Sequence, residues 1–147
     1  RHPMANKDRV NAAKDTIDEE YISREASKIT EDDLHTIAEK ADEIWKRFEN
    51  EGPLARFLED ARLLLAVTTD YLDGQYRTIP YFSIAAVAVA LLYVLNPFDL
   101  IPDVIPVVGY VDDAAVVGLC LKMIEQDLHA YKVWKTEQEV GSLSSGE

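Results

Sequence analysis

The 147-residue sequence contains one cysteine, three histidines, six glycines and six prolines. The single cysteine, Cys120, excludes an internal disulfide and a cysteine-rich zinc site, and its apolar neighbours predict a small core residue rather than a nucleophile. His35 and His129 lie in amphipathic stretches and are expected at the surface. The sequence has no G-x-S-x-G elbow, phosphate-binding glycine loop or H-E-x-x-H motif. It therefore contains no recognisable catalytic constellation, and no cofactor is predicted.

Basic residues are scarce, because 15 lysines and arginines face 27 aspartates and glutamates, and the net charge is -12. Such a chain repels phosphate groups, so nucleic acid is not an expected partner. Anionic lipid headgroups repel it as well, and any membrane attachment would have to be hydrophobic. The opening residues lack the apolar run of a secretory signal, which favours a cytoplasmic location. Residues 1–3 look like an expression remnant.

Strand signals are lacking too, and the apolar residues recur at helical spacings instead. Residues 1–29 carry only a weak apolar stripe, which predicts a loosely held N-terminal arm. A helix is expected over 31–50, with Thr30 as its capping residue. Its apolar seam must pack either on the core of this chain or on another chain. We predict partner binding by the seam residues Leu34, Ile37, Ile44 and Phe48.

Further helices are predicted within a helical domain that spans residues 30–140. One begins at Pro53 and ends near Gly74. The next covers about 80–95, and its sequence "IPYFSIAAVAVALLYVL" is apolar on every side, which is typical of a helix in a protein core or in lipid. A last helix is expected over about 112–138, before a flexible tail at 141–147.

The segment "NPFDLIPDVIPVVGYVDD", from Asn96 to Asp113, connects the two apolar helices. Residues before proline disfavour the helical conformation, so this segment is not expected to be regular helix. Its apolar side chains favour a loop that is packed rather than solvated. The predicted fold is an all-α bundle of four or five helices around a central apolar antiparallel pair, which this packed loop joins.

The carboxylates of this segment have two interpretations. In the first, Asp99 and Asp103 accept hydrogen bonds within a short turn, and Asp112 or Asp113 caps the last helix. In the second, the same four aspartates, assisted by Asn96, bind magnesium, calcium or manganese or act as acid/base groups. Their spacing does not match a calcium-binding loop, and we favour the structural interpretation.

Residues 91–117 resemble the YkvA-like family of unknown function, the DUF1232 domain. The family pattern is an apolar helix, then P-x-D-x-I-P-D, an apolar proline turn, a glycine and a D-D pair. It is matched, directly after Asn96, at Pro97, Asp99, Ile101, Pro102, Asp103, Pro106, Gly109, Asp112 and Asp113. Residues 54–90 and 118–136 look like the extended form found in bacterial members. The resemblance implies a helical domain, carried by some relatives within membrane proteins, and it implies no established reaction.

Two environments are considered for the apolar helices, a soluble bundle and a membrane-embedded hairpin. Residues 79–95 are apolar enough to enter lipid, but they are marginally short for a hydrocarbon core of about 30 Å. In residues 104–121, Asp112 and Asp113 oppose insertion. The bundle covers the apolar surfaces, so we favour it, with association at the inner membrane as the alternative.

The predicted function is a non-enzymatic acidic scaffold or adaptor. It would bind a protein partner, a membrane protein or a second copy through the seam on 34–48 and the loop at 98–108. One alternative is a divalent-metal-dependent regulator or enzyme that uses the aspartates of the proline segment. The other alternative is the membrane-embedded hairpin.

Millimolar magnesium, calcium and manganese are expected to leave the melting temperature unchanged, because the favoured interpretation ties the aspartates to backbone donors rather than to an ion. Scanning calorimetry with and without each ion measures this. A rise in Tm that disappears in the Asp99→Asn and Asp103→Asn variants would show instead that the segment binds metal.

Overall fold

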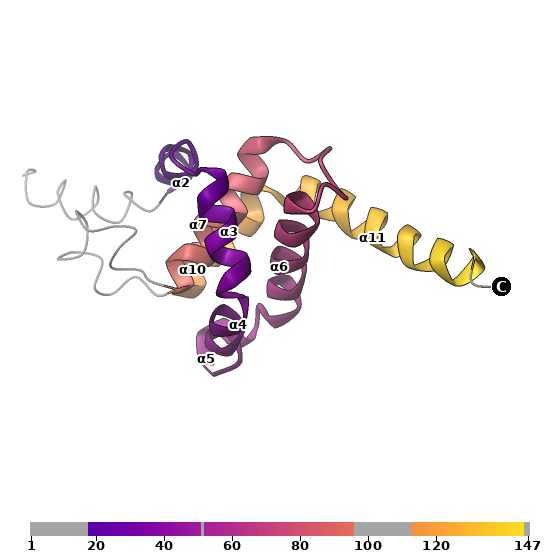
Figure 1. Ribbon diagram of the computed structural model, residues 1–147. Coiled ribbons are helices and arrows are strands. Elements are labelled where there is room, and N and C mark those ends of the chain that lie inside the picture. Colours follow the sequence, from indigo (N-terminus) through magenta and orange to yellow (C-terminus); the bar gives the residue numbers. More distant parts are fainter. Residues whose placement is uncertain (1–17, 51, 96–112, 146–147) are drawn as a thin grey trace, which may run out of the picture.

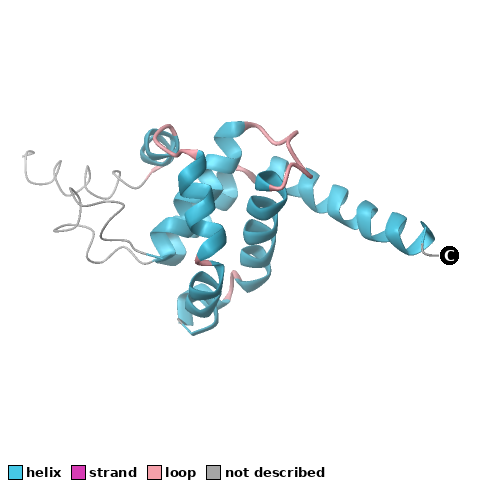
Figure 2. Ribbon diagram, in the orientation of Figure 1, coloured by secondary structure: helices cyan, strands magenta, loops and turns pink. Residues whose placement is uncertain are grey.

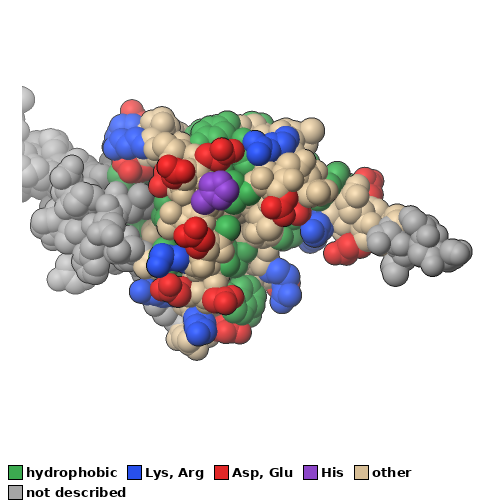
Figure 3. All heavy atoms as spheres, in the orientation of Figure 1, with side chains coloured by type: hydrophobic (Ala, Val, Ile, Leu, Met, Phe, Trp, Pro, Cys, Tyr) green, Lys and Arg blue, Asp and Glu red, His purple; other side chains and the backbone are tan. Residues whose placement is uncertain are grey.

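The computed structural model describes residues 18–50, 52–95 and 113–145, without the side chains of 113 and 142–145. Every regular element in these ranges is a helix, which confirms the predicted all-α class (Figure 2). These ranges contain eight helical segments rather than the predicted four or five, because several predicted helices are interrupted. Side chains of both charge signs are interspersed over the face shown in Figure 3.

The first described helix, α2 (Glu19–Ala26), belongs to the core. Asp18 caps it, since its Oδ1 accepts a hydrogen bond from the Tyr21 backbone N–H at 2.9 Å. Tyr21, Ile22, Ala26 and Ile29 are buried, and the helix packs on α7 (Tyr81–Leu95). The prediction of a loosely held arm is therefore wrong for residues 18–29, because the weak apolar stripe is sufficient to cover one side of α7.

The helix predicted over 31–50 is divided into α3 (Glu31–Glu39) and α4 (Ala41–Asn50). The predicted capping box forms, and the Thr30 backbone N–H donates to Asp33 Oδ2 at 2.8 Å. The break lies at Lys40, whose φ of -106° and ψ of 20° leave the α-helical region. The Lys40 N–H still donates to the carbonyls of Thr36 and Ile37, so the break leaves this amide paired. The position contains neither proline nor glycine, which is why the pattern did not indicate it.

The seam predicted to bind a partner is part of the core of this chain. Its four residues, Leu34, Ile37, Ile44 and Phe48, are 0 % exposed. Both α3 and α4 pack against α7 and against α6 (Leu58–Leu72). The assignment of a partner-binding surface to these four side chains is therefore corrected: the apolar face is satisfied within the chain.

The helix predicted from Pro53 to Gly74 is also divided, into α5 (Gly52–Ala55) and α6. Pro53 lies in the first turn of α5, as expected from its missing N–H. Asp73 ends α6, and Gly74 follows with a φ of +79°, a left-handed conformation that glycine adopts without strain. The predicted end of this helix is thus confirmed.

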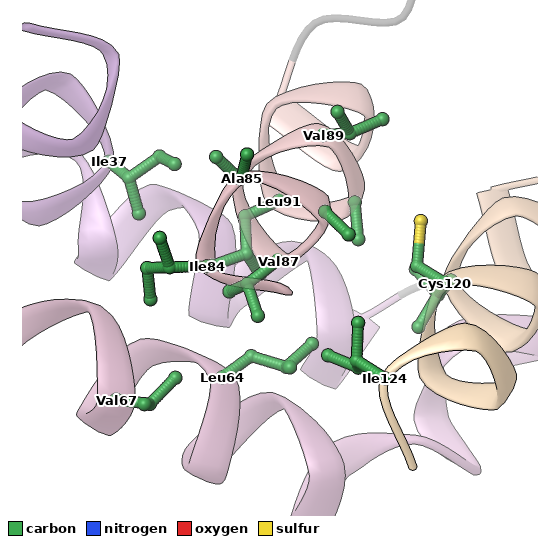
Figure 4. Packing of buried hydrophobic residues seen from close by; sticks show 14 of the residues in the cluster. Ile37, Leu64, Val67, Ile84, Ala85, Val87, Val89, Leu91, Cys120 and Ile124 are labelled. Carbon is green, nitrogen blue, oxygen red and sulfur yellow. The ribbon is translucent and has the colours of Figure 1, made fainter. Parts of the chain in front are cut away.

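Helix α7 occupies the centre of the structure, as its all-round apolar sequence predicts (Figure 1). Residues 83–91 are all buried, and α2, α3, α4, α6 and α10 (Asp113–Met123) surround them. In Figure 4, Ile37 of α3 and Leu64 of α6 point toward Ile84 and Val87 of α7. Within the described ranges, no helix has both the length and the hydropathy that crossing a membrane requires. Contacts of α7 with five other helices are what the predicted bundle requires.

The last predicted helix consists of α10 and α11 (Glu125–Ser145), which are separated by a turn at Ile124. Helix α10 packs on α7, so the two predicted central helices are in contact. Helix α11 continues to Ser145, into the range predicted as a flexible tail. Its second half extends away from the body (Figure 1).

The variant Phe48→Ala is expected to lower the free energy of unfolding by about 3–5 kcal/mol, because it leaves a cavity in a fully buried site. Urea denaturation followed by circular dichroism measures the change. The neighbouring exposed substitution Glu49→Ala is the matched control and is expected to stay within about 0.5 kcal/mol of the parent. Equal stability of the two variants would contradict the core assignment of the seam.

Candidate functional site

The proline segment lies almost wholly outside the described residues. This applies to the motif residues Asn96, Pro97, Asp99, Ile101, Pro102, Asp103, Pro106, Gly109 and Asp112. Asp113 is the first residue of α10, although its side chain is not described. The turn and the metal site proposed for this segment therefore stay predictions. Among the residues that the structure describes, no group of three or more histidine, cysteine or acidic side chains is arranged to hold a metal.

An open groove of about 390 Å³ lies between α6, α10 and α11, and we call it the α11 groove. Its apolar lining comes from three leucines, one on each helix, and its rim carries charged and polar side chains. The lining residues are Asp60, Leu63, Gly118, Leu121, Lys122, Glu125, Leu128, His129 and Lys132. Neither the groove nor its position was predicted from the sequence.

Helical periodicity explains how one wall of the groove collects its polar residues. Lys122, Glu125, His129 and Lys132 recur at spacings of three and four across the junction of α10 and α11. Burial raises the pKa of the Asp60 carboxyl on the opposite wall, the Lys132 ammonium lowers it, and Glu59 raises it further. With two lysines against two acids, the groove is close to neutral in a chain whose net charge is -12.

Gly118 lets α10 approach the turn that precedes α6. A Cβ at this position would lie 3.4 Å from Cζ of Phe57, which is at the near limit of ordinary contact. Phe57 is itself partly buried against the core. Position 118 therefore lies within contact range of Phe57, and the missing side chain leaves space in the groove.

A polar cluster fixes α11 against the end of α6. The Tyr131 hydroxyl donates to Asp70 Oδ2 at 2.6 Å, and Lys135 Nζ donates to the same oxygen at 3.1 Å. Burial raises the pKa of Tyr131, and the hydrogen bond to Asp70 raises it further. Tyr76 packs edge-on against Tyr131, with ring centroids 5.0 Å apart, and lies 4.9 Å from the ring of Trp134. These contacts determine where the groove wall on α11 lies.

A second polar contact joins α11 to the central helix. The hydroxyl of Ser83, a buried residue near the start of α7, donates to a carboxylate oxygen of Asp127. Sequence reasoning missed this pair, because the two residues are far apart in the chain. The available signal was Ser83 itself, a small hydroxyl in an otherwise apolar helix, since a buried hydroxyl requires a hydrogen-bond partner.

One buried side-chain oxygen of the described part lacks a hydrogen-bond partner. It is the hydroxyl oxygen of Tyr21, on the side of α2 that enters the core. Burial raises the pKa of this phenol, Glu25 and Tyr93 raise it further, and the Arg24 guanidinium lowers it. The hydroxyl therefore stays protonated at neutral pH.

The predictions for Cys120 and the two histidines are confirmed. Cys120 is 1 % exposed and lies among the core residues of α10. His35 and His129 are exposed, on α3 and α11 respectively. The sulfur is therefore a core atom, whereas His129 contributes to the rim of the α11 groove.

Comparisons with known proteins agree with the motif. Residues 83–119 match a family model described as "Protein of unknown function (DUF1232)". The chain is also similar to the "Uncharacterized membrane protein YkvA" of Bacillus subtilis (strain 168), with 37% identity over 68 residues. These matches support a YkvA-like, DUF1232 assignment. The aligned region covers 46% of this chain and 64% of the relative, which is less than two thirds of its length.

The residues that match DUF1232 correspond to the centre of the helical bundle. It begins within α7 and ends within α10, so it contains most of the central packed pair and the segment between them. The α11 side of the groove lies outside the match. No solved structure is significantly similar to the chain.

The pKa of the Cys120 thiol provides a test of how well α10 is buried. Burial raises the pKa of this thiol from 9.0 to about 12. Between these values the thiol ionises in the unfolded chain but stays neutral in the folded chain. The free energy of unfolding is therefore expected to fall as the pH rises above 9. The decrease should be smaller in the Cys120→Ala variant, which lacks the thiol. Urea unfolding of both proteins at pH 8 and pH 10 measures the difference.

Thiol labelling at pH 8 is the accompanying control. Iodoacetamide is expected to label Cys120 only when urea unfolds the chain, because the neutral buried thiol does not react. A cysteine introduced at exposed Thr136 in the Cys120→Ala background should be labelled at once. Rapid labelling of Cys120 in the folded protein would show that the core around α10 is open.

Proposed function

We propose that this DUF1232 chain is a non-enzymatic helical scaffold that binds a protein partner through the α11 groove. The observation that carries the proposal is the composition of this open groove, in which Leu63, Leu121 and Leu128 are bordered by Lys122 and Lys132. An apolar centre with a charged border is typical of protein-binding surfaces. A small ligand usually has most of its surface buried in a pocket, and an open groove offers less enclosure.

The anchoring of α11 supports the same function. The groove wall is held in place by Asp70, through Tyr131 and Lys135, and by the contact between Ser83 and Asp127. A surface whose side chains are already ordered loses less conformational entropy on binding. The contact surface proposed on residues 34–48 is replaced by this groove. The loop at 98–108 lies outside the described residues and stays a predicted second contact.

The two alternative functions concern where the partner lies and whether the chain needs a metal. The relative from Bacillus subtilis is named a membrane protein, and we propose that the partner of this chain lies at the inner membrane. The net charge of -12 disfavours direct contact with anionic lipid, which is consistent with recruitment by a protein. The metal-dependent alternative rests on the aspartates of the proline segment, and the calorimetric comparison with ions decides it.

Site-specific photo-crosslinking in living cells tests the groove. A photo-crosslinking amino acid in place of His129 is expected to give a discrete protein adduct, because this exposed residue borders the groove. The same substitution at His35 on α3, an exposed histidine away from the groove, is the matched control and should give none. Co-flotation of the adduct with membrane vesicles would place the partner at a membrane.

The charge variant Lys122→Glu with Lys132→Glu provides the specificity control. It is expected to reduce the adduct several-fold, because the border charges orient a partner during association. Adducts of equal yield from the His129 and His35 positions, or no adduct from either, would contradict the proposed function.

A further inference from the structure

The second half of α11 exposes an apolar stripe that the described residues of this chain do not cover. Residues 136–140 are all exposed, Val140 is 57 % exposed, and Val133 is 43 % exposed. These valines are seven residues apart and therefore lie on the same face of the helix. Most helical stability in proteins comes from packing of an apolar face, so this projecting end is expected to gain stability from a partner.

The exposed stripe is continuous with the α11 groove. His129, Val133, Thr136 and Val140 follow one another at spacings of four, three and four, so they share one face of α11. His129 lines the groove, and Val140 lies on the projecting half. The opposite face of α11 is the one that meets the body, through Tyr131 and Lys135. One helix therefore presents both a groove wall and the exposed side chains of Val133 and Val140 on the same side.

The charge changes sign along this side of α11, from Lys132 beside the groove to Glu139 on the projecting half. The groove as a whole is close to neutral, because Lys122 and Lys132 lie beside Asp60 and Glu125. The charged residues of the exposed stretch 136–140 are Glu137 and Glu139, both acidic. Within the described residues, neither glutamate lies within ion-pair distance of a basic side chain, whereas Lys135 is already paired with Asp70. A second α11, running antiparallel, would bring its Glu139 beside Lys132 of the first.

We propose that the occupant of the α11 groove is the projecting half of α11 from a second copy of this chain. The two helices pair antiparallel about a two-fold axis level with Lys135 and Thr136. In this register Lys132 faces Glu139 of the second copy, and Val140 of the second copy lies between His129 and Val133. The contact is isologous, so each groove is filled by the other copy and no open surface is left to form fibres. This inference rests on the proposed function and specifies its partner.

A charge swap tests the pairing by sedimentation velocity at micromolar concentrations. The parent chain is expected to sediment as a dimer. Lys132→Glu or Glu139→Lys alone should raise the dimer Kd roughly tenfold, because like charges then oppose each other. The combined variant, Lys132→Glu with Glu139→Lys, should restore the dimer. Glu39→Lys, an exposed change on α3, is the charge-matched control and should leave the Kd unchanged.

Crosslinking of the purified chain locates the contact. A photo-crosslinker at His129, used in an equal mixture of isotopically light and heavy chains, is expected to join His129 of one copy to residues 136–145 of the other. Mixed-isotope peptides prove that the link is between copies. Protection of Cys120 from labelling confirms that each variant is folded.

The outcomes separate this inference from the proposed function. A chain that stays monomeric at about 100 µM, or a combined variant that stays as weak as the single ones, overturns the paired α11 helices. If the His129 crosslinker then captures a different protein in cells, and His35 does not, the groove remains the binding site. Absence of any adduct from His129 overturns both.

Discussion

The burial of α7 is the constraint on which the rest of the structure depends. A fifteen-residue helix that is apolar on every side has no face that is stable in water, so it requires cover all round. The chain supplies this cover from α2, α3, α4, α6 and α10, and residues 83–91 are all buried. The apolar faces of the covering helices are used for this purpose, which explains why the seam on α3 and α4 is not a contact surface.

Helix α11 is held by a different kind of interaction. Its first half is attached through charged and aromatic groups, in which the Asp70 carboxylate accepts hydrogen bonds from Tyr131 and Lys135. Hydrogen bonds and ring contacts are directional, so they define the rotation of α11 about its axis more closely than apolar packing does. That rotation places His129 and Lys132 at the groove and leaves Val140 exposed. The groove and the projecting end are thus consequences of one anchoring cluster.

The family signature and the candidate site occupy adjoining parts of the molecule. The DUF1232 match covers most of the α7 and α10 pair, whose packing forms the centre of the bundle. Gly118 belongs both to this match and to the groove, on the part of α10 that lies near Phe57. The family region therefore provides a scaffold, and α11, which lies outside the match, adds the surface that we propose for binding.

The sequence by itself determined the helical class, the central position of α7, the burial of Cys120 and the caps at Thr30 and Gly74. These features follow from the periodicity and chemistry of neighbouring residues. Only the tertiary structure decided that Leu34 and Phe48 are internal, that the helix breaks at Lys40, and that Asp70 meets Tyr131. Periodicity gives the direction of each apolar face but not the surface that covers it, because helix packing brings together residues that are far apart in the chain. For the same reason the α11 groove, which three helices form, has no signature in any one stretch of sequence.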